Sequence, residues 1–281
     1  MVAERIVSLL PSATEIVCAL GLEDRLVGVS HSCDHPETIR DLPRLSRPRA
    51  RLEGLSSGDI DEAIRAALRD HGSVYEIDIA AIRALKPDLV ITQGICDVCA
   101  VPESQVVAAS VGSRILTIDA HDLDAIFASI RAIGRAAEVD ERATALVADM
   151  QGRIAEVQRR VAGRPRPRVL ALEWLDPPYV PGHWVPELID LAGGVLLAGT
   201  ARRPSYRVEW RELETMRPDD LLIMPCGFTL EETRRDAARF DRQLRALGGR
   251  MHLLDASSYF SRSGPRVVDG LEILAATIFP A

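Results

Sequence analysis

Residues 79–92, IAAIRALKPDLVIT, decide the fold, because residues 210–224, WRELETMRPDDLLIM, repeat the same plan. In each stretch a short helix is predicted, over Ile79–Leu85 and over Trp210–Met216, and it runs into a basic residue, a proline and an aspartate. The proline ends the helix, and the apolar run after it is typical of a strand buried in a parallel sheet. The sequence therefore contains one helix–turn–strand unit twice.

Two further pairs of segments follow the same order. A strand and then a helix that ends at glycine are predicted within Arg5–Gly21 and again within Arg168–Gly194. Apolar strands at Arg114–Asp119 and Arg250–Asp255 each precede another helical pattern. Strands that alternate with helices in this way predict an α/β fold with mainly parallel sheets.

The repeat predicts two similar α/β lobes joined by a single long helix, with a ligand cleft between the lobes. We expect an N-terminal lobe over residues 1–139, a connecting helix over 140–163 and a C-terminal lobe over 164–281. Apolar residues three or four positions apart across Glu141–Val161 indicate the connecting helix. Arg44–Gly72 has no counterpart in the second half, so we interpret it as an insertion.

Composition narrows the class of protein. The 281 residues carry a net charge of −7, which argues against a nucleic-acid partner, and no apolar run is long enough to span a bilayer. Ile6–Leu10 reads as a first strand rather than a secretory signal. Together with an odd count of five cysteines, this favours the cytoplasm as the chain stands, or an extracytoplasmic (periplasmic) location if a signal has been removed. We expect a monomer.

The sequence predicts no enzyme and no required cofactor. The nucleophile-elbow, dinucleotide-binding, phosphate-loop and HExxH motifs are all missing, so no catalytic residue is assigned. Cys96 and Cys99 form a CxxC motif, which occurs in redox pairs and zinc sites. A zinc site usually needs a second such pair, so we predict no metal. A cytoplasmic enzyme or metal-binding protein that uses Cys96 and Cys99 stays an alternative.

The loops after the strands are the expected ligand contacts, because ligands of open α/β sheets bind beyond the carboxyl ends of the strands. Only 4% of the residues are aromatic, yet the predicted loops of the second lobe hold half of these rings: Trp174, Tyr179, Trp184, Phe228, Tyr259 and Phe260. Such a lining suits a large, flat, partly apolar ligand, although the rings could instead fix the loops, and His183 could cap a helix. The candidate ligand-binding residues are Ser12, Gln93, Trp174, His183, Trp184, Phe228, Tyr259, Phe260 and Arg262.

Several motifs resemble the helical-backbone (class III) branch of the periplasmic-binding-protein superfamily, and within it the vitamin B12-binding proteins of ABC importers. The segments that carry the resemblance are RIVSLLPSATE at 5–15, LVGVS at 26–30, LKPDLV at 85–90 and YFSRSGPR at 259–266. The segments 93–99, 182–187 and 225–228 resemble a narrower subgroup described as cobalamin-binding.

The resemblance implies a non-catalytic protein that captures a tetrapyrrole-sized corrinoid, such as cobalamin, between its lobes. The protein would serve an ABC importer or be a cytoplasmic relative of such proteins. The resemblance also implies carboxylates that meet the importer's membrane subunits: Glu103 on the first lobe, and Glu231 or Glu232 on the second. An iron–siderophore or haem binder on the same fold is the alternative. The arginines that would suit an anionic ligand of this kind are Arg202, Arg203, Arg207, Arg262 and Arg266.

Overall fold

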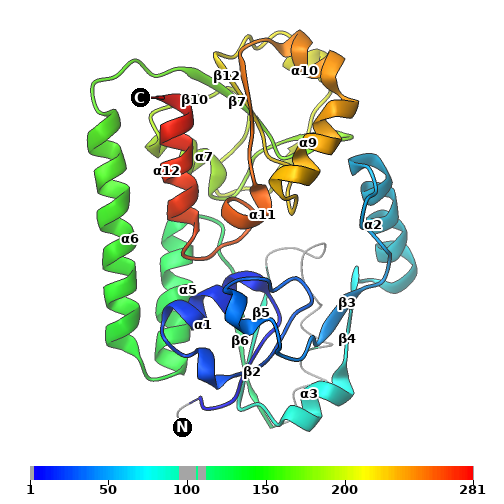
Figure 1. The fold of residues 1–281 in the computed structure, drawn as a ribbon, viewed down its shortest axis with the longest axis vertical. Helices are drawn as coiled ribbons and strands as arrows, with labels where there is room; N and C mark the ends of the chain where they lie inside the picture. Colours follow the sequence, from blue (N-terminus) through cyan, green and yellow to red (C-terminus); the bar gives the residue numbers. More distant parts are fainter. Residues whose placement is uncertain (1–2, 95–105, 107–111, 281) are drawn as a thin grey trace. The chain divides into compact units, whose positions relative to one another are not determined.

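The chain forms two compact α/β units, as expected from the repeat (Figure 1). The computed structural model describes residues 3–94, 106 and 112–280. The first unit comprises Met1–Glu53, Glu62–Ala120 and Asp124–Asp149, and the second comprises Gly54–Asp61, His121–Leu123 and Met150–Ala281. Helix α6 (Asp140–Val161) passes from the first unit to the second. The predicted fold class is confirmed, whereas the exact lobe boundaries 1–139 and 164–281 stay a prediction.

The first unit is built on a parallel sheet of four strands in the order β2–β1–β5–β6. These strands are β1 (Ile6–Ser8), β2 (Leu26–Val29), β5 (Leu89–Gln93) and β6 (Arg114–Ile118). An antiparallel pair, β3 and β4, follows β2 along the chain. The remaining elements are α1 (Pro11–Ala19), β3 (Ser46–Pro48), α2 (Ser57–His71), β4 (Tyr75–Ile77), α3 (Ile79–Leu85) and α5 (Leu123–Ala136).

The second unit repeats this plan with a parallel sheet in the order β10–β7–β12–β13. Its strands are β7 (Arg168–Leu172), β10 (Val195–Leu196), β12 (Asp220–Ile223) and β13 (Arg250–Leu253). A small antiparallel sheet, β11–β9–β8, is formed by β8 (Trp174–Leu175), β9 (Pro178–Val180) and β11 (Tyr206–Arg207). Its helices are α7 (Val185–Leu191), α8 (Trp210–Leu213), α9 (Leu230–Arg239), α10 (Asp241–Leu247), α11 (Ala256–Tyr259) and α12 (Val267–Ile278).

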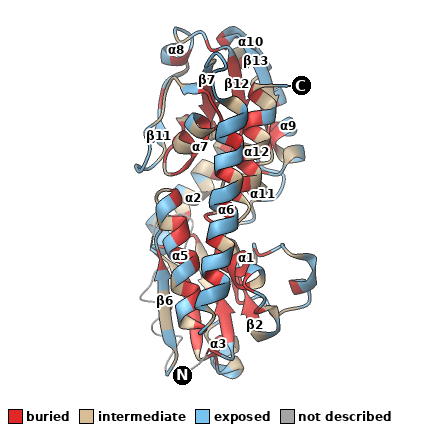
Figure 2. Cartoon of the chain, turned by 90° about the vertical axis from the view of Figure 1, so that its left-hand side faces the viewer, coloured by how far each residue is buried: buried red, intermediate tan, exposed pale blue. Residues whose placement is uncertain are grey.

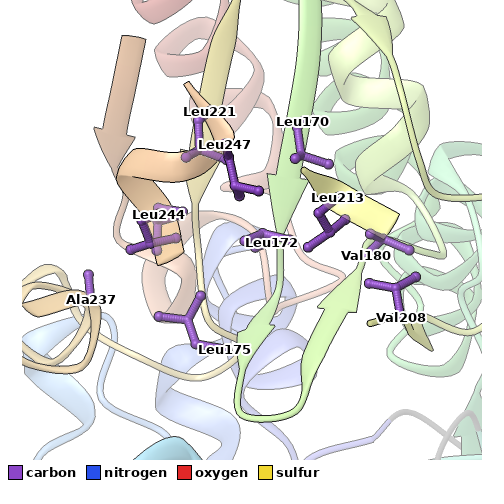
Figure 3. Close-up of a cluster of buried hydrophobic side chains, with 11 residues drawn as sticks. Leu170, Leu172, Leu175, Val180, Val208, Leu213, Leu221, Ala237, Leu244 and Leu247 are labelled. Atoms are coloured by element: carbon purple, nitrogen blue, oxygen red, sulfur yellow. The ribbon is translucent and has the colours of Figure 1, made fainter. Parts of the chain in front are cut away.

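Apolar side chains from strands and helices fill the core of each unit. In the second unit Leu170 and Leu172 on β7 pack with Leu221 on β12 and with Leu244 and Leu247 on α10, and all five are buried (Figure 3). Exposed residues alternate with buried ones along the helices, as along α6 in Figure 2. Burial of these apolar stripes, at about 25 cal/mol per Å², is the main force that folds each unit. None of the described helices is both long and apolar enough to cross a membrane.

The repeated proline turn has the same backbone conformation before its proline in both units. The residue before each proline, Lys86 and Arg217, has a positive φ, of 46° and 50°. A left-handed residue at this point stops the helix, and the proline cannot continue it. Lys86 is itself the C-cap of α3, whereas α8 ends at Leu213, three residues before the predicted end of that helix, and Arg217 lies in the turn beyond it.

The aspartate after each proline connects the turn to the first strand of its sheet. Asp88 accepts a hydrogen bond from the backbone N–H of Arg5 at 3.2 Å, and Asp219 accepts one from that of Arg168 at 2.7 Å. The Arg5 side chain donates to the carbonyl of Leu85, the last residue of α3, and the Arg168 side chain donates to the carbonyl of Met216, directly before Arg217. The basic–Pro-Asp motif thus positions one strand start in each unit, which is why it marks the fold so clearly in the sequence.

The antiparallel sheet β11–β9–β8 corrects one expectation. Trp174 lies on β8, Tyr179 on β9 and Tyr259 on α11, so these rings do not lie in loops as predicted. The strands were missed because they are only two or three residues long, too short for a visible alternation of apolar and polar residues. The segment interpreted as an insertion contains helix α2 over Ser57–His71.

Candidate ligand-binding site

The candidate residues of the second unit gather where β7, β12 and β13 end. Trp174 follows β7 directly, and its ring meets that of Phe228, which follows β12, edge to face at 5.2 Å between centroids. The backbone carbonyl of Phe228 accepts a hydrogen bond from Ser257 N–H at 2.9 Å, in α11 just after β13. Arg262 donates to Ser257 Oγ at 3.3 Å. These contacts connect the segments that follow β7, β12 and β13.

His183 lies in a tight turn just before α7. Its backbone φ is +50°, and its ring is stacked at 5.6 Å between centroids on that of His121, a residue that the sequence analysis did not single out. The N-cap residue of α7 is Trp184, whose side chain forms no capping hydrogen bond. The imidazole is half-buried, which leaves part of it available to a ligand.

Tyr259 and Arg262 are also half-buried, like the candidate ligand-binding residues Trp174 and His183 of the second unit. The guanidinium of Arg266 lies over the Tyr259 ring, 5.8 Å from its centroid, a distance at which a cation and an aromatic face attract each other. Tyr259 is the last residue of α11, and Arg262 lies in the segment between α11 and α12. Both side chains therefore belong to the turn that follows β13.

Trp184, Phe228 and Phe260 are the buried members. Their exposed fractions are 7%, 8% and 3%, and the indole of Trp184 donates to the backbone carbonyl of Phe260 at 3.0 Å. These three rings hold the turn before α7 and the turn after α11 to the body of the unit. Direct contact of these rings with a ligand stays a prediction.

The first unit contributes two candidates at the ends of its own strands. Ser12 lies in the first turn of α1, after β1, and is 3% exposed. Gln93 is the last residue of β5 and is partly exposed. Cys96, Cys99 and Glu103 lie outside the described residues. No group of three or more His, Cys, Asp or Glu side chains suited to a metal occurs in the part of the chain that the structure describes.

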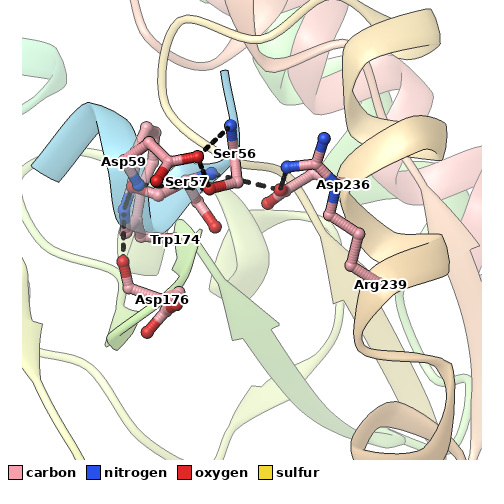
Figure 4. A network of polar contacts seen from close by, with 7 residues as sticks. All are labelled: Ser56, Ser57, Asp59, Trp174, Asp176, Asp236 and Arg239. Atoms are coloured by element: carbon pink, nitrogen blue, oxygen red, sulfur yellow. Dashed lines mark hydrogen bonds and ion pairs between the residues drawn. The ribbon is translucent and has the colours of Figure 1, made fainter. Parts of the chain in front are cut away.

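A polar network attaches the first turn of α2 to the second unit (Figure 4). Asp236 on α9, 3% exposed, accepts the Ser57 N–H at 3.2 Å, and the Trp174 indole donates to the Ser57 carbonyl at 3.2 Å. Ser56 caps the turn, because its Oγ accepts the Asp59 N–H at 3.1 Å. The network contacts the candidate residue Trp174 and was not predicted, since its members are separated by 117 and 179 residues in the sequence.

Glu173 is the second group that the sequence analysis missed. Its carboxyl group is enclosed by the protein and accepts hydrogen bonds from the Ser205 hydroxyl and from the Gly182 N–H. Burial raises the pKa of Glu173 to about 7, and the two hydrogen bonds oppose that rise. No local pattern in the sequence identifies Glu173, because its partners Gly182 and Ser205 lie on other segments of the chain.

The carboxylates expected to meet a partner differ in their surroundings. Glu232 is used within α9, because its Oε2 accepts the Thr229 N–H at 2.9 Å and the Thr229 hydroxyl at 2.8 Å. The Glu231 side chain is 70% exposed, and its nearest cation, Arg234, is 4.0 Å away. Of the two, Glu231 is the carboxylate presented to solvent.

A repeated α/β plan, with aromatic and polar side chains gathered at strand ends, defines a two-lobed substrate-binding protein. A family model described as "Periplasmic binding protein" matches residues 6–254, and the chain belongs to this family. Its members are non-catalytic, so the chain is a binding protein and the enzymatic alternative is set aside.

Individual relatives differ in what their names say they bind. An uncharacterized ABC transporter substrate-binding lipoprotein of Bacillus subtilis is 23% identical over 286 residues, with coverage of 99% of this chain and 80% of that protein. A vitamin B12-binding protein of Vibrio cholerae is 26% identical over 219 residues, with coverage of 77% and 68%. A solved periplasmic heme-binding protein from Pseudomonas aeruginosa is 21% identical, with a TM-score of 0.72 and coverage of 100% and 94%.

Proposed function

We propose that this chain is the substrate-binding component of an ABC importer, acts outside the cytoplasmic membrane and captures a corrinoid such as cobalamin. The observation that carries the ligand class is the set of half-buried rings of the second unit: Trp174 after β7, Tyr259 after β13 and the His183 imidazole before α7. Half-buried rings beside an imidazole suit a flat macrocycle with neutral amide side chains. The names of the Vibrio cholerae and Bacillus subtilis relatives support the ligand and the transport role.

The remaining candidates take supporting roles in this proposal. Ser12 and Gln93 on the first unit, and Arg262 on the second, would form hydrogen bonds with the periphery of the ligand. Trp184, Phe228 and Phe260 would hold the loops that carry the other side chains, in keeping with their burial.

A haem or an iron–siderophore complex is the second candidate ligand, and the solved haem-binding neighbour supports it. A ligand with several negative charges needs cationic side chains that can turn toward it. Three of the candidate arginines have protein partners: Arg202 forms an ion pair with Asp122 at 2.9 Å, Arg207 forms one with Glu209 at 3.1 Å, and Arg266 covers the Tyr259 ring. These contacts favour the corrinoid.

Titration of the purified chain with cyanocobalamin, haem and a ferric siderophore, followed by absorbance and calorimetry, tests the proposal. We expect cobalamin to bind with a Kd of tens of micromolar or tighter, about −6 kcal/mol or more. Tyr259→Ala should weaken binding about tenfold or more, since an aromatic contact contributes on the order of 1.5 kcal/mol. Tyr206→Ala, a 42% exposed tyrosine on β11, is the matched control. Haem binding without corrinoid binding would select the second candidate and overturn the first.

Glu231 is the docking carboxylate that we propose for the second unit. Glu231→Lys should weaken binding to an importer reconstituted in lipid vesicles, mainly through slower association, because charges at an interface rim act on the rate of encounter. Glu214→Lys, an equal charge change at another exposed glutamate, should leave docking unchanged. Equal binding by both variants, alone and combined with Glu103→Lys, would refute the assignment.

A further inference from the structure

Two segments of the second unit meet along the turn that carries His183. His183 N–H donates to the Arg203 carbonyl at 2.7 Å, and Arg202 N–H donates back to the His183 carbonyl at 3.0 Å. Between them the backbones pack so closely that a Cβ on Gly182 would lie 2.3 Å from the Arg203 carbonyl oxygen. Only glycine fits at this position, so the two segments hold each other in one arrangement.

The side chain of Glu173 accepts a hydrogen bond from each of the same two segments. One hydrogen bond comes from Gly182 N–H, the residue directly before His183, and the other comes from the Ser205 hydroxyl, two residues after Arg203. The carboxyl group therefore acts on the position of His183 without touching that side chain.

The left-handed backbone of His183 explains why such support is needed. A residue other than glycine with a φ of +50° is strained by about 1 kcal/mol or more and persists only where its surroundings hold it. The ring is stacked on His121 in this conformation, so loosening the turn would move the imidazole away from its place in the candidate site.

We propose that Glu173 is a positioning residue for ligand binding: through Gly182 and Ser205 it holds the His183 imidazole in place, and its protonation state sets how firmly. This inference rests on the proposed ligand-binding role of His183. An ionised carboxylate accepts both hydrogen bonds as charge-assisted contacts. A protonated carboxyl is neutral and has one O–H donor, so the hydrogen bonds from Ser205 and Gly182 lose their charge assistance and weaken.

The protonation change falls in an accessible range, because burial raises the pKa of Glu173 to about 7. The titratable groups on the segments packed against Glu173 are Tyr179, His183, Arg202, Arg203, Tyr206, Arg207 and Cys226, and His121 and Asp122 contact His183 and Arg202. Arg202 and Arg207 form ion pairs with Asp122 and Glu209. The turn is therefore held more firmly above pH 7 than below it.

The test measures the turn without any ligand. In the wild-type protein the amide proton of Gly182, followed by NMR from pH 5.5 to 8.5, should titrate with an inflection near pH 7. Glu173→Gln, which keeps the shape of the side chain and cannot ionise, should abolish the inflection, whereas Glu214→Gln should preserve it. An inflection that survives in Glu173→Gln, or that is missing from the wild type, overturns the proposal.

Ligand binding then provides the second measurement. Wild-type affinity for cyanocobalamin should be about fivefold higher at pH 8 than at pH 6, which corresponds to about 1 kcal/mol for stronger hydrogen bonds. Glu173→Gln should bind with less than a twofold difference between these pH values. A fivefold difference that persists in Glu173→Gln overturns the inference. Failure of the wild type to bind any corrinoid refutes the proposed ligand instead, and the Gly182 titration still decides the positioning role.

Discussion

Replacing Asp236 with alanine tests how the first turn of α2 is held in the second unit. The buried carboxylate accepts the Ser57 N–H at 3.2 Å. A hydrogen bond to a charged group contributes about 1.5–3 kcal/mol, so its loss should speed local opening of residues 54–61 by about 10- to 150-fold. The second carboxylate oxygen, Oδ2, is buried without a hydrogen-bond partner in the described structure, and its removal relieves about 1–3 kcal/mol. The two effects nearly cancel in the global free energy of unfolding, whereas only the first acts on local opening.

Hydrogen–deuterium exchange of peptides that cover residues 54–61, paired with chemical denaturation, separates the two effects. We expect faster exchange in Asp236→Ala with the free energy of unfolding changed by less than about 1 kcal/mol. Arg239→Ala is the matched control, because this half-exposed guanidinium lies 3.8 Å from Asp236 and such pairs contribute about 0–1 kcal/mol. Exchange over 54–61 that equals the wild type in Asp236→Ala would show that the carboxylate does not hold this turn.

Two further predictions concern stability. Leu172→Ala should lower the free energy of unfolding by about 2–5 kcal/mol in chemical denaturation, because Leu172 is fully buried. Val195→Ala, the control at a 42% exposed position, should change this free energy by about 0.5 kcal/mol or less. Equal losses in the two variants would contradict the assigned core. The Arg153 guanidinium, at 2.8 Å, holds the pKa of Glu272 below its usual 4.5, so the pair stabilises the fold above that pH and loses its effect as the pH falls through the lowered pKa. Glu272→Gln should therefore make thermal stability decline less steeply between pH 5 and 3. The difference from the wild type should be under about 1 kcal/mol, because both side chains of the pair are over a third exposed. An equally steep decline in the variant would argue against this ion pair.

The repeated proline turn made the fold readable from the sequence because its effects are local. A left-handed residue, a proline and a buried run act within ten residues, and Asp88 and Asp219 then hydrogen-bond to strand starts in matching places. Helix α3 (Ile79–Leu85) has its predicted bounds for the same reason. Local signals of this kind do not depend on contacts with distant parts of the chain.

The parts that sequence reasoning missed depend on distant partners. Glu173 gains its role from Gly182 and Ser205, and Ser57 gains its place from Asp236, which is 179 residues away. Neither glutamate nor serine carries a pattern that announces such a contact. The rings at strand ends were predicted as a group, yet their division into buried Trp184 and half-buried Trp174 follows from packing that no local pattern encodes.

The second unit is assembled from pieces that are far apart in the chain, and this restricts the order of folding. Residues 54–61 leave the ribosome early, but the groups that receive them, on Trp174 and Asp236, follow 117 and 179 residues later. At about 5–20 residues per second, Ser57 waits roughly 6–23 s of synthesis for Trp174 alone. A fragment that stops at Asp149 would contain residues 54–61 without their hydrogen-bond partners Trp174 and Asp236. A fragment that starts at Met150 would contain Asp236 without the Ser57 N–H that it binds. Neither half of the chain is a complete folding unit by itself.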